Sequence, residues 1–194
     1  MGPTTSEKAS AKREAILDAA LELFVERGFH GTAVPAVAEK AGVGAGTIYR
    51  HFESKEALVN ALYQKWKAEI SAFCMQAIAP AAPAREQFRT TWRQLTAFVR
   101  RHPRAFAFLE LHHHASYLDE TSRALESRVI DLTRELIVVA QREQAMKPLA
   151  PELLMTMVYG AFVAIVRASN EGRLPFDDET LAAAEQCCWE AVRA

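Results

Sequence analysis

The stretch that decides the fold is Thr32–Leu58, TAVPAVAEKAGVGAGTIYRHFESKEAL. Apolar residues at helical spacing predict a helix that has Pro35 in its first turn and ends before Gly42, then a second helix of about two turns that ends near Phe52. Ser54 is a favourable N-cap for a third helix. Two short helices joined by a glycine-bearing turn are typical of proteins that place the second helix in a groove of DNA.

The second short helix carries small, polar, aromatic and basic side chains suited to DNA. Its glycine-rich start would let the backbone approach base edges closely. The hydroxyls of Thr47 and Tyr49 suit phosphate oxygens, and the guanidinium of Arg50 suits the O6 and N7 atoms of guanine. The free N–H groups after Ser54 would add a phosphate site at a helix N-terminus. The predicted DNA contacts are Gly44, Ala45, Gly46, Thr47, Tyr49, Arg50, His51 and Lys55.

A core is expected beneath this face, and two other interpretations of the stretch are possible. Val43 and Ile48 should fill that core together with Ile16, Ala20, Phe24, Val37 and Ala38. The first alternative is a helical hairpin that only packs, with Tyr49 half-buried; it explains any one residue but not the whole set. The second is a nucleotide-binding loop at GVGAGT, which lacks the lysine of GxxxxGK[ST], the GxGxxG spacing and a preceding strand.

Charge and cysteine content limit the class of protein. The chain has 194 residues and a formal net charge of −1, and through residue 60 seven basic residues face eight acidic ones. This balance counts against a non-specific polyelectrolyte, so DNA binding must depend on a few placed contacts.

The cysteines form no CxxC pair or disulfide framework, and no signal peptide is recognised, which predicts a cytoplasmic protein. The longest apolar run, 153–166, is too short for a membrane span and predicts a buried helix.

Helical periodicity continues along nearly the whole chain, and no segment alternates apolar and polar residues as a strand does. The sequence therefore predicts an all-α protein of about nine helices, with residues 1–8 disordered. Besides the two short helices, the expected helices lie at about 10–27, 54–78, 85–101, 103–113, 119–145, 151–169 and 177–193.

Two segments, REAILDAALELFVERGFHGT (13–32) and VPAVAEKAGVGAGTIYRHFESKEAL (34–58), resemble the TetR family of transcriptional regulators, over about a quarter of the chain. Many members of that family carry a hydroxyl or basic side chain where this chain has Val34 and Pro35, so no side-chain contacts to DNA are expected there. The family pattern places DNA contacts at Thr47, Tyr49, Arg50, His51 and Lys55.

The resemblance implies a helix-turn-helix DNA-binding domain at 1–57 and a helical effector-binding and dimerisation domain at 58–194. In the family, the last two helices form a four-helix bundle with a partner subunit. Small and apolar residues at helical spacing favour such a seam here, although an intramolecular core gives a similar pattern. The expected dimer interface comprises Gly160, Ala161, Ala164, Ala168, Leu181, Ala184, Cys188, Trp189 and Val192.

A pocket for a hydrophobic or aromatic effector is expected among the middle helices, although the same side chains also suit an ordinary core. Its candidate lining residues are Trp92, Phe98, Phe106, Leu109, Glu110, His113, Met155, Tyr159 and Phe162.

The run His112–His114 offers an alternative, a metal site. Successive helical residues point about 100° apart, so at most two of the three could share one ion, and no HExxH or CxxC spacing is present. We therefore predict no metal and no cofactor. The favoured function is a homodimeric repressor without enzymatic activity, released from a palindromic operator in double-stranded DNA by a small ligand. An effector-independent or activating regulator, and a helical metal-binding protein, remain open.

Overall fold

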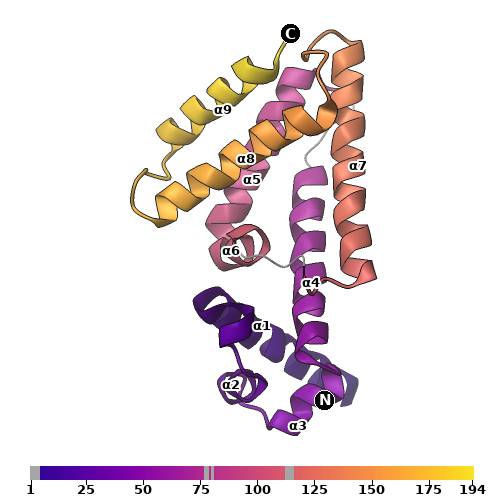
Figure 1. Cartoon of the computed structure of the whole chain (residues 1–194), viewed down its shortest axis with the longest axis vertical. Helices are drawn as coiled ribbons and strands as arrows, with labels where there is room; N and C mark the ends of the chain where they lie inside the picture. The colour runs from indigo at the N-terminus through magenta and orange to yellow at the C-terminus, as the bar shows by residue number, and fades with distance from the viewer. Residues whose placement is uncertain (1–4, 77–78, 80, 112–115) are drawn as a thin grey trace. The chain divides into compact units, whose positions relative to one another are not determined.

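The computed structural model describes residues 5–76, 79, 81–111 and 116–194. These residues contain nine α-helices and no strand, which confirms the all-α prediction (Figure 1). One isolated antiparallel bridge pairs Met146 with Arg193. The helices are α1 (Thr5–Gly31), α2 (Val34–Lys40), α3 (Ala45–His51), α4 (Lys55–Met75), α5 (Ala84–Arg101), α6 (Pro103–Leu111), α7 (Glu120–Arg142), α8 (Pro151–Asn170) and α9 (Asp178–Val192).

The first helix differs from its prediction at both ends. It begins at Thr5, so residues 5–8 are helical where disorder was expected, and Glu7 in the first turn complements the positive end of the helix dipole. Gly28 interrupts the helix with φ 68° and ψ 176°, directly after the predicted end at residue 27, but the chain turns helical again as far as Gly31. The buried Thr32 hydroxyl then donates to the carbonyl oxygens of Leu23 and Gly28, at 3.0 and 2.8 Å.

The chain forms two compact units, which are described separately. Unit 1 comprises Met1–Ala68 and His102–Arg123, and unit 2 comprises Glu69–Arg101 and Ala124–Ala194. Unit 1 therefore combines α1, α2, α3 and the first part of α4 with α6 (Pro103–Leu111), which comes much later in the chain. Within unit 1, α2 packs against both α1 and α3, and α6 packs against α1.

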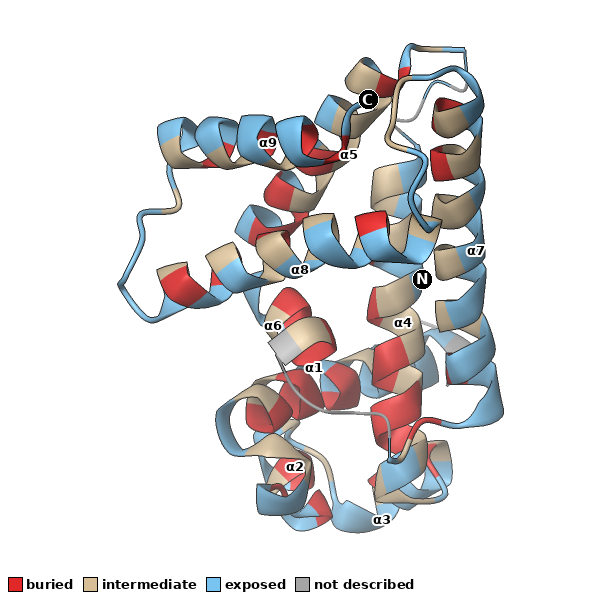
Figure 2. Cartoon of the chain, turned by 45° about the horizontal axis from the view of Figure 1, so that its top comes forward, coloured by how far each residue is buried: buried red, intermediate tan, exposed pale blue. Residues whose placement is uncertain are grey.

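The core of unit 1 contains the apolar residues expected beneath the short helices, and Figure 2 shows buried positions along α1. Phe106 and Phe108 of α6 add two fully buried rings, of which Phe108 stacks on Phe24 with centroids 6.3 Å apart. On α4, the buried Trp66 ring lies 5.1 Å from His102. The predicted core residues Ile16, Ala20, Phe24, Val37, Ala38 and Ile48 are buried, and Val43 is partly buried.

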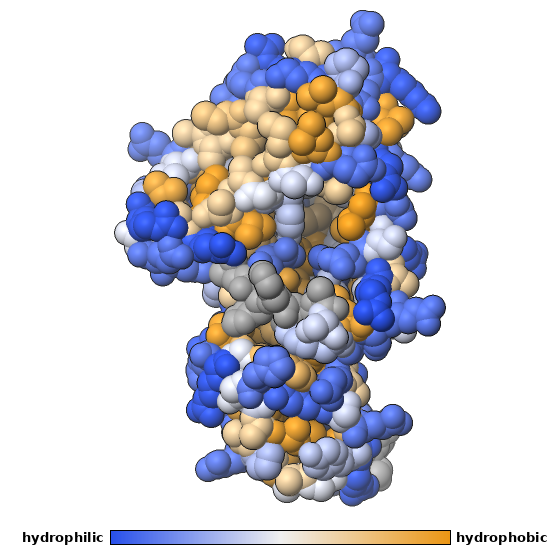
Figure 3. All heavy atoms as spheres, viewed as in Figure 1, coloured by the Kyte–Doolittle hydropathy of each residue, from blue (hydrophilic) through white to orange (hydrophobic). Residues whose placement is uncertain are grey.

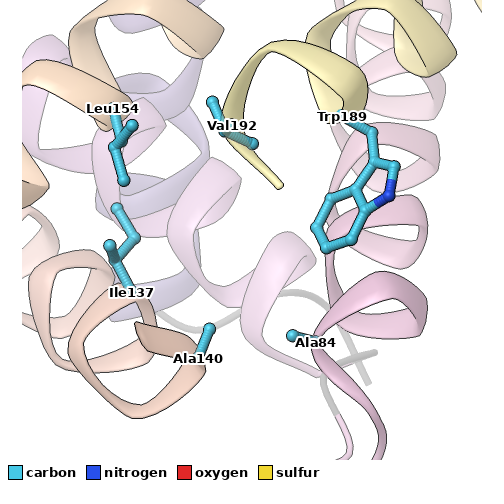
Figure 4. Close-up of a cluster of buried hydrophobic side chains, with 6 residues drawn as sticks. All are labelled: Ala84, Ile137, Ala140, Leu154, Trp189 and Val192. Atoms are coloured by element: carbon cyan, nitrogen blue, oxygen red, sulfur yellow. The ribbon is translucent and has the colours of Figure 1, made fainter. Parts of the chain in front are cut away.

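Unit 2 has its own core, in which side chains from α5, α7, α8 and α9 converge (Figure 4). A charged pair completes it: Glu185 of α9 is buried and accepts two hydrogen bonds from Arg85 of α5, whose guanidinium also lies 5.2 Å from the Trp189 ring. This pairing raises the pKa of Arg85. The clustered residues are Ala84, Ile137, Ala140, Leu154, Trp189 and Val192.

Helix α8 is longer than the apolar run that predicted it. With 20 residues it is long and apolar enough to cross a membrane, a test that the core helix of a soluble protein also passes. Its buried residues, Leu154 and Phe162 among them, pack within unit 2. One such helix is weak evidence for a membrane span.

Candidate nucleic-acid interface

The turn between α2 and α3 fixes the direction of α3. Gly42 adopts φ 65°, a left-handed conformation that favours glycine, and the N–H of Val43 donates to the carbonyl of Ala38 at 3.0 Å. Ile48 is then buried and anchors α3 from below. Because α3 has only seven residues, this one anchor leaves most of its side chains free to face outward.

Most of α3 is exposed (Figure 2), and its outward face contains the side chains predicted to contact DNA. Tyr49 is 56% exposed and Arg50 is exposed, while Thr47 and His51 are partly buried. A large aromatic ring held this far into solvent gains little from packing within the chain. The face therefore presents hydroxyl, imidazole and guanidinium groups together, a combination that suits both phosphates and base edges.

The start of α3 has open space around its backbone. A Cβ atom added at Gly44 or Gly46 would meet nothing within 4 Å, and neither residue has a positive φ. The fold itself therefore does not require glycine at either position. With the exposed Ala45 between them, these residues leave room for another molecule to approach the backbone closely.

Lys55 opens α4 beside this face. Ser54 caps the helix as predicted, since its hydroxyl accepts a hydrogen bond from the Ala57 N–H at 3.0 Å. The Lys55 ammonium lies 4.2 Å from the centroid of the Phe29 ring, and Phe29 stacks on Tyr117 with centroids 4.3 Å apart. The sequence pattern identified Lys55 but not these two aromatic residues, because Tyr117 is distant from Phe29 in the chain.

A buried asparagine in α4 connects the same region to the segment before α7. The Asn60 amide group donates to the carbonyl oxygens of Glu56 and Tyr117, at 2.9 and 2.8 Å. Its oxygen accepts from the Asp119 N–H and from the Ser122 hydroxyl, both at 2.8 Å. A hydrogen bond from the Ser122 N–H lowers the pKa of Asp119. Sequence reasoning missed one signal here, the asparagine within the apolar run LVNALY. A buried amide needs hydrogen-bond partners, so an asparagine in such a run indicates a tertiary contact.

Comparison with known proteins agrees with this geometry. Residues 16–62 match the family model for bacterial regulatory proteins of the tetR family, and residues 57–194 match the tetracyclin repressor-like C-terminal domain. The chain belongs to the TetR family of transcriptional regulators. This TetR-family protein is therefore a DNA-binding transcriptional regulator, and α2 and α3 form its helix-turn-helix.

Individual relatives extend the match over most of the chain. The regulator is 32% identical to the HTH-type transcriptional regulator RutR of Escherichia coli (strain K12) over 160 residues, which are 80% of this chain and 74% of RutR. A TetR-family structure from Vibrio parahaemolyticus shares 30% identity and a TM-score of 0.76, covering 94% of this chain and 99% of that one. Another from Marinobacter aquaeolei VT8 has a TM-score of 0.86 at 24% identity, covering 97% and 99%, and supports the fold alone.

The candidate effector-binding residues of the regulator divide between the two units. In unit 2, Trp92 and Phe162 meet edge to face with centroids 5.1 Å apart, and the Trp92 indole N–H donates to the Leu181 carbonyl at 3.1 Å. Phe98 is fully buried, while Met155 and Tyr159 are partly buried.

In unit 1, Phe106 and Leu109 are buried, and Glu110 forms a charged pair with Lys67. The Glu110 carboxylate lies 3.6 Å from the Lys67 ammonium, and its buried Oε1 accepts no hydrogen bond from the described residues. His113 lies outside the described residues, as does the rest of the His112–His114 run considered for metal. Among the described residues, no group of three His, Cys, Asp or Glu side chains could hold a metal ion.

The residues of the expected dimer interface differ in how far their own chain buries them. Leu181, Trp189 and Val192 are buried in the core of unit 2, and Ala168 is buried as well, because the apolar stripe of α9 faces its own chain. Gly160 and Ala164 are exposed, and Ala161, Ala184 and Cys188 are partly buried. Figure 3 shows apolar residues gathered over α8 and α9, and the exposed apolar side chains there include Leu153 and Met157.

Proposed function

We propose that this regulator is a homodimeric repressor that leaves a palindromic operator when a small hydrophobic or aromatic ligand binds. The observation that carries the proposal is the outward face of α3, where Tyr49 and Arg50 are exposed above one buried anchor. We further propose that residues 1–57 act as the DNA-binding domain and 58–194 as the effector-binding and dimerisation domain. In this proposal the protein is cytoplasmic and has no enzymatic activity.

Each predicted DNA contact has a chemical role in the proposal. Arg50 donates two hydrogen bonds to a guanine edge, and Thr47 and Tyr49 donate to phosphates. His51, Lys55 and the first N–H groups of α4 hold further phosphates. Gly44, Ala45 and Gly46 make van der Waals contact with the groove and leave part of the specificity to DNA shape.

A palindromic operator needs two recognition helices related by twofold symmetry, and we propose that the exposed face of α8 and α9 supplies the dimer contact. Leu153, Met157, Gly160 and Ala164 recur at helical spacing along one side of α8, and all four are exposed. A Cβ atom added at Gly160 would meet nothing within 4 Å of its own chain, which leaves room for a partner helix. On α9, the exposed Ala183 and Cys187 extend this small, apolar surface.

The effector in the proposal is mainly apolar and carries one polar group. The proposed lining combines the buried rings of Trp92, Phe98 and Phe162 with the partly exposed side chains of Tyr159 and Met155. Unit 1 offers a separate candidate acceptor for a ligand donor: the Glu110 Oε1 is buried 3.6 Å from the Lys67 ammonium and accepts no hydrogen bond from the described residues. The repressor leaves the operator if the ligand binds more tightly to a dimer geometry that does not fit the operator.

The test is binding to the DNA that flanks the regulator's own gene, with and without candidate aromatic and hydrophobic ligands. The proposal expects a retarded complex on that DNA at moderate salt, and its loss when the right ligand is added. Binding that no ligand reduces would favour an effector-independent regulator, and binding that leads to more transcription would favour an activator. No sequence-specific binding would contradict the proposal as a whole.

The Arg50→Ala and Lys55→Ala variants test the division of roles. Arg50→Ala should lose about 1–3 kcal/mol of binding to the operator and much less to scrambled DNA, since it removes base recognition. Lys55→Ala should weaken binding to all sequences alike and reduce the salt dependence by about one counterion. Equal losses on both DNAs for Arg50→Ala would contradict its assigned role.

A further inference from the structure

Lys55 is held by an aromatic ring rather than left to move in solvent. Its ammonium lies 4.2 Å from the centroid of Phe29, a distance at which the ring face attracts a cation. Phe29 follows the break in α1 at Gly28, and its ring is partly buried. A lysine on an exposed helix start would otherwise sample many rotamers, and it would lose that freedom on binding a phosphate.

Phe29 is itself held by a second ring. The Tyr117 ring stacks on it with centroids 4.3 Å apart and planes inclined by 20°. Tyr117 lies 88 residues further along the chain than Phe29, in the segment that leads into α7, so this contact connects two distant parts of unit 1.

The backbone of Tyr117 is fixed in turn to α4, the helix that Lys55 opens. Asn60 is only 4% exposed, and it uses both its amide hydrogens and its oxygen in hydrogen bonds. One of these bonds joins its Nδ2 to the Tyr117 carbonyl at 2.8 Å. Asp119 and Ser122 donate to its oxygen, so residues 117–122 are attached to the first turns of α4 at several points.

We propose that Phe29 and Tyr117 are positioning residues for Lys55, which hold its ammonium ready for a DNA phosphate. This inference rests on the proposed phosphate contact of Lys55. It also means that the segment 117–122 sets the strength of one DNA contact, because any displacement of Tyr117 removes the support of the Phe29 ring.

If the Phe29 ring had the opposite role, removing it would change DNA affinity in the opposite direction. If Phe29 withheld the ammonium from DNA, removing the ring would free Lys55 and tighten binding. The two roles are therefore separated by the direction in which a Phe29 variant changes affinity.

The experiment is a double-mutant cycle on a mixed-sequence DNA duplex at low salt, measured by fluorescence anisotropy with the full-length protein. A mixed-sequence duplex suffices because a phosphate contact does not depend on the base sequence. Phe29→Leu should weaken binding by about two- to fivefold when Lys55 is present, the value expected for a cation–π contact at a partly exposed site. In the Lys55→Ala background, the same substitution should change affinity little.

Two further variants keep the result interpretable. Tyr117→Leu should show the same coupling to Lys55, whereas Phe108→Leu removes a buried ring elsewhere in unit 1 and should act additively with Lys55→Ala. Thermal unfolding of each variant checks that it is folded at the assay temperature.

Three outcomes would overturn the inference. Equal effects of Phe29→Leu in both backgrounds would show that the ring acts only through general stability. Tighter binding of Phe29→Leu would show that the ring withholds Lys55. If Lys55→Ala itself leaves affinity unchanged, the proposed phosphate contact fails, and the positioning role fails with it. If Lys55→Ala weakens binding but Phe29→Leu shows no coupling to Lys55, only the positioning role is rejected.

Discussion

Helix α3 and the pair α8–α9 both bury one side and expose the other, but they do so in different proportions. In α3 a single residue, Ile48, is buried, and the neighbouring helices and turn supply the remaining support. In α9 four residues are buried in a stripe, including the charged Glu185, and α8 buries four more. The short helix is thus almost entirely surface, whereas the long pair is both core and surface.

This difference shows how each region can be altered. On α3, side chains can change with little effect on folding, because packing depends on one position. On α9, the buried stripe stabilises unit 2, so only the exposed positions of α8 and α9 can serve a partner subunit. The following predictions test this contrast, beginning with the largest expected effect.

Removing the buried charge of Glu185 on α9 should destabilise the folded protein more than any other change proposed. Glu185→Ala leaves Arg85 without its partner and should lower the free energy of unfolding by about 3 kcal/mol, the lower end for a buried ion pair, since Arg85 retains some contact with water. Urea denaturation measures this loss. Glu190→Ala is the matched control on the same helix: its partner Arg193 is exposed, and the loss should stay below about 1 kcal/mol. Similar losses for both variants would remove the distinction between the two sides of α9.

The exposed side of α8 should matter for assembly rather than folding. Met157→Glu places a charge in the proposed seam and should weaken the dimer on the order of tenfold or more. Leu132→Glu on α7 is the control, because Leu132 is 44% exposed and Met157 is 45% exposed. Sedimentation velocity at several concentrations distinguishes the two. A dimer that tolerates Met157→Glu would place the seam elsewhere.

A substitution at the start of α3 should separate stability from DNA binding. Gly46→Ala adds a methyl group to a helix position with open space, so it should raise the free energy of unfolding by roughly 0.5–1 kcal/mol. The same methyl group reduces the room for DNA and should lower affinity several-fold. Denaturation measures the free energy of unfolding, and fluorescence anisotropy on the same protein sample measures the affinity for DNA. Affinity that rises together with stability would argue against a close approach of α3 to the groove.

The smallest expected effect concerns the cap of α9. The Asp177 carboxylate accepts a hydrogen bond from the Thr180 N–H at 2.8 Å, which lowers its pKa below the ordinary value of 3.8. A carboxyl with a lowered pKa stabilises the folded state above its ordinary pKa, and this contribution disappears as the pH falls through the lowered value. The advantage of the wild type over Asp177→Asn should therefore be constant near neutrality and shrink between pH 4 and 2. An advantage that grows in acid would contradict the cap.

The features that sequence reasoning predicted correctly depend on neighbours in the chain. The turn at Gly42, the cap at Ser54, the break at Gly28 and the anchor Ile48 all follow from residues within a few positions of one another. A local pattern fixes such features because the interacting groups are only a turn or two apart.

The features that it missed depend on distant partners. An apolar stripe such as Leu181, Trp189 and Val192 predicts burial but cannot distinguish the chain's own core from a second subunit. Likewise, nothing near Asn60 in the sequence indicates that its partner is the carbonyl of Tyr117. Such pairings result from the packing of whole helices, and a single sequence contains no direct signal for them.

The placement of the tryptophans provides an optical probe of each unit. The chain has three, all buried: Trp66 lies in unit 1 beside His102, and Trp92 and Trp189 lie in unit 2. A chain with Trp92→Phe and Trp189→Phe would show tryptophan emission only from unit 1, and one with Trp66→Phe only from unit 2. Their emission spectra during titration with DNA or with ligand would then report which unit responds first, without any attached dye.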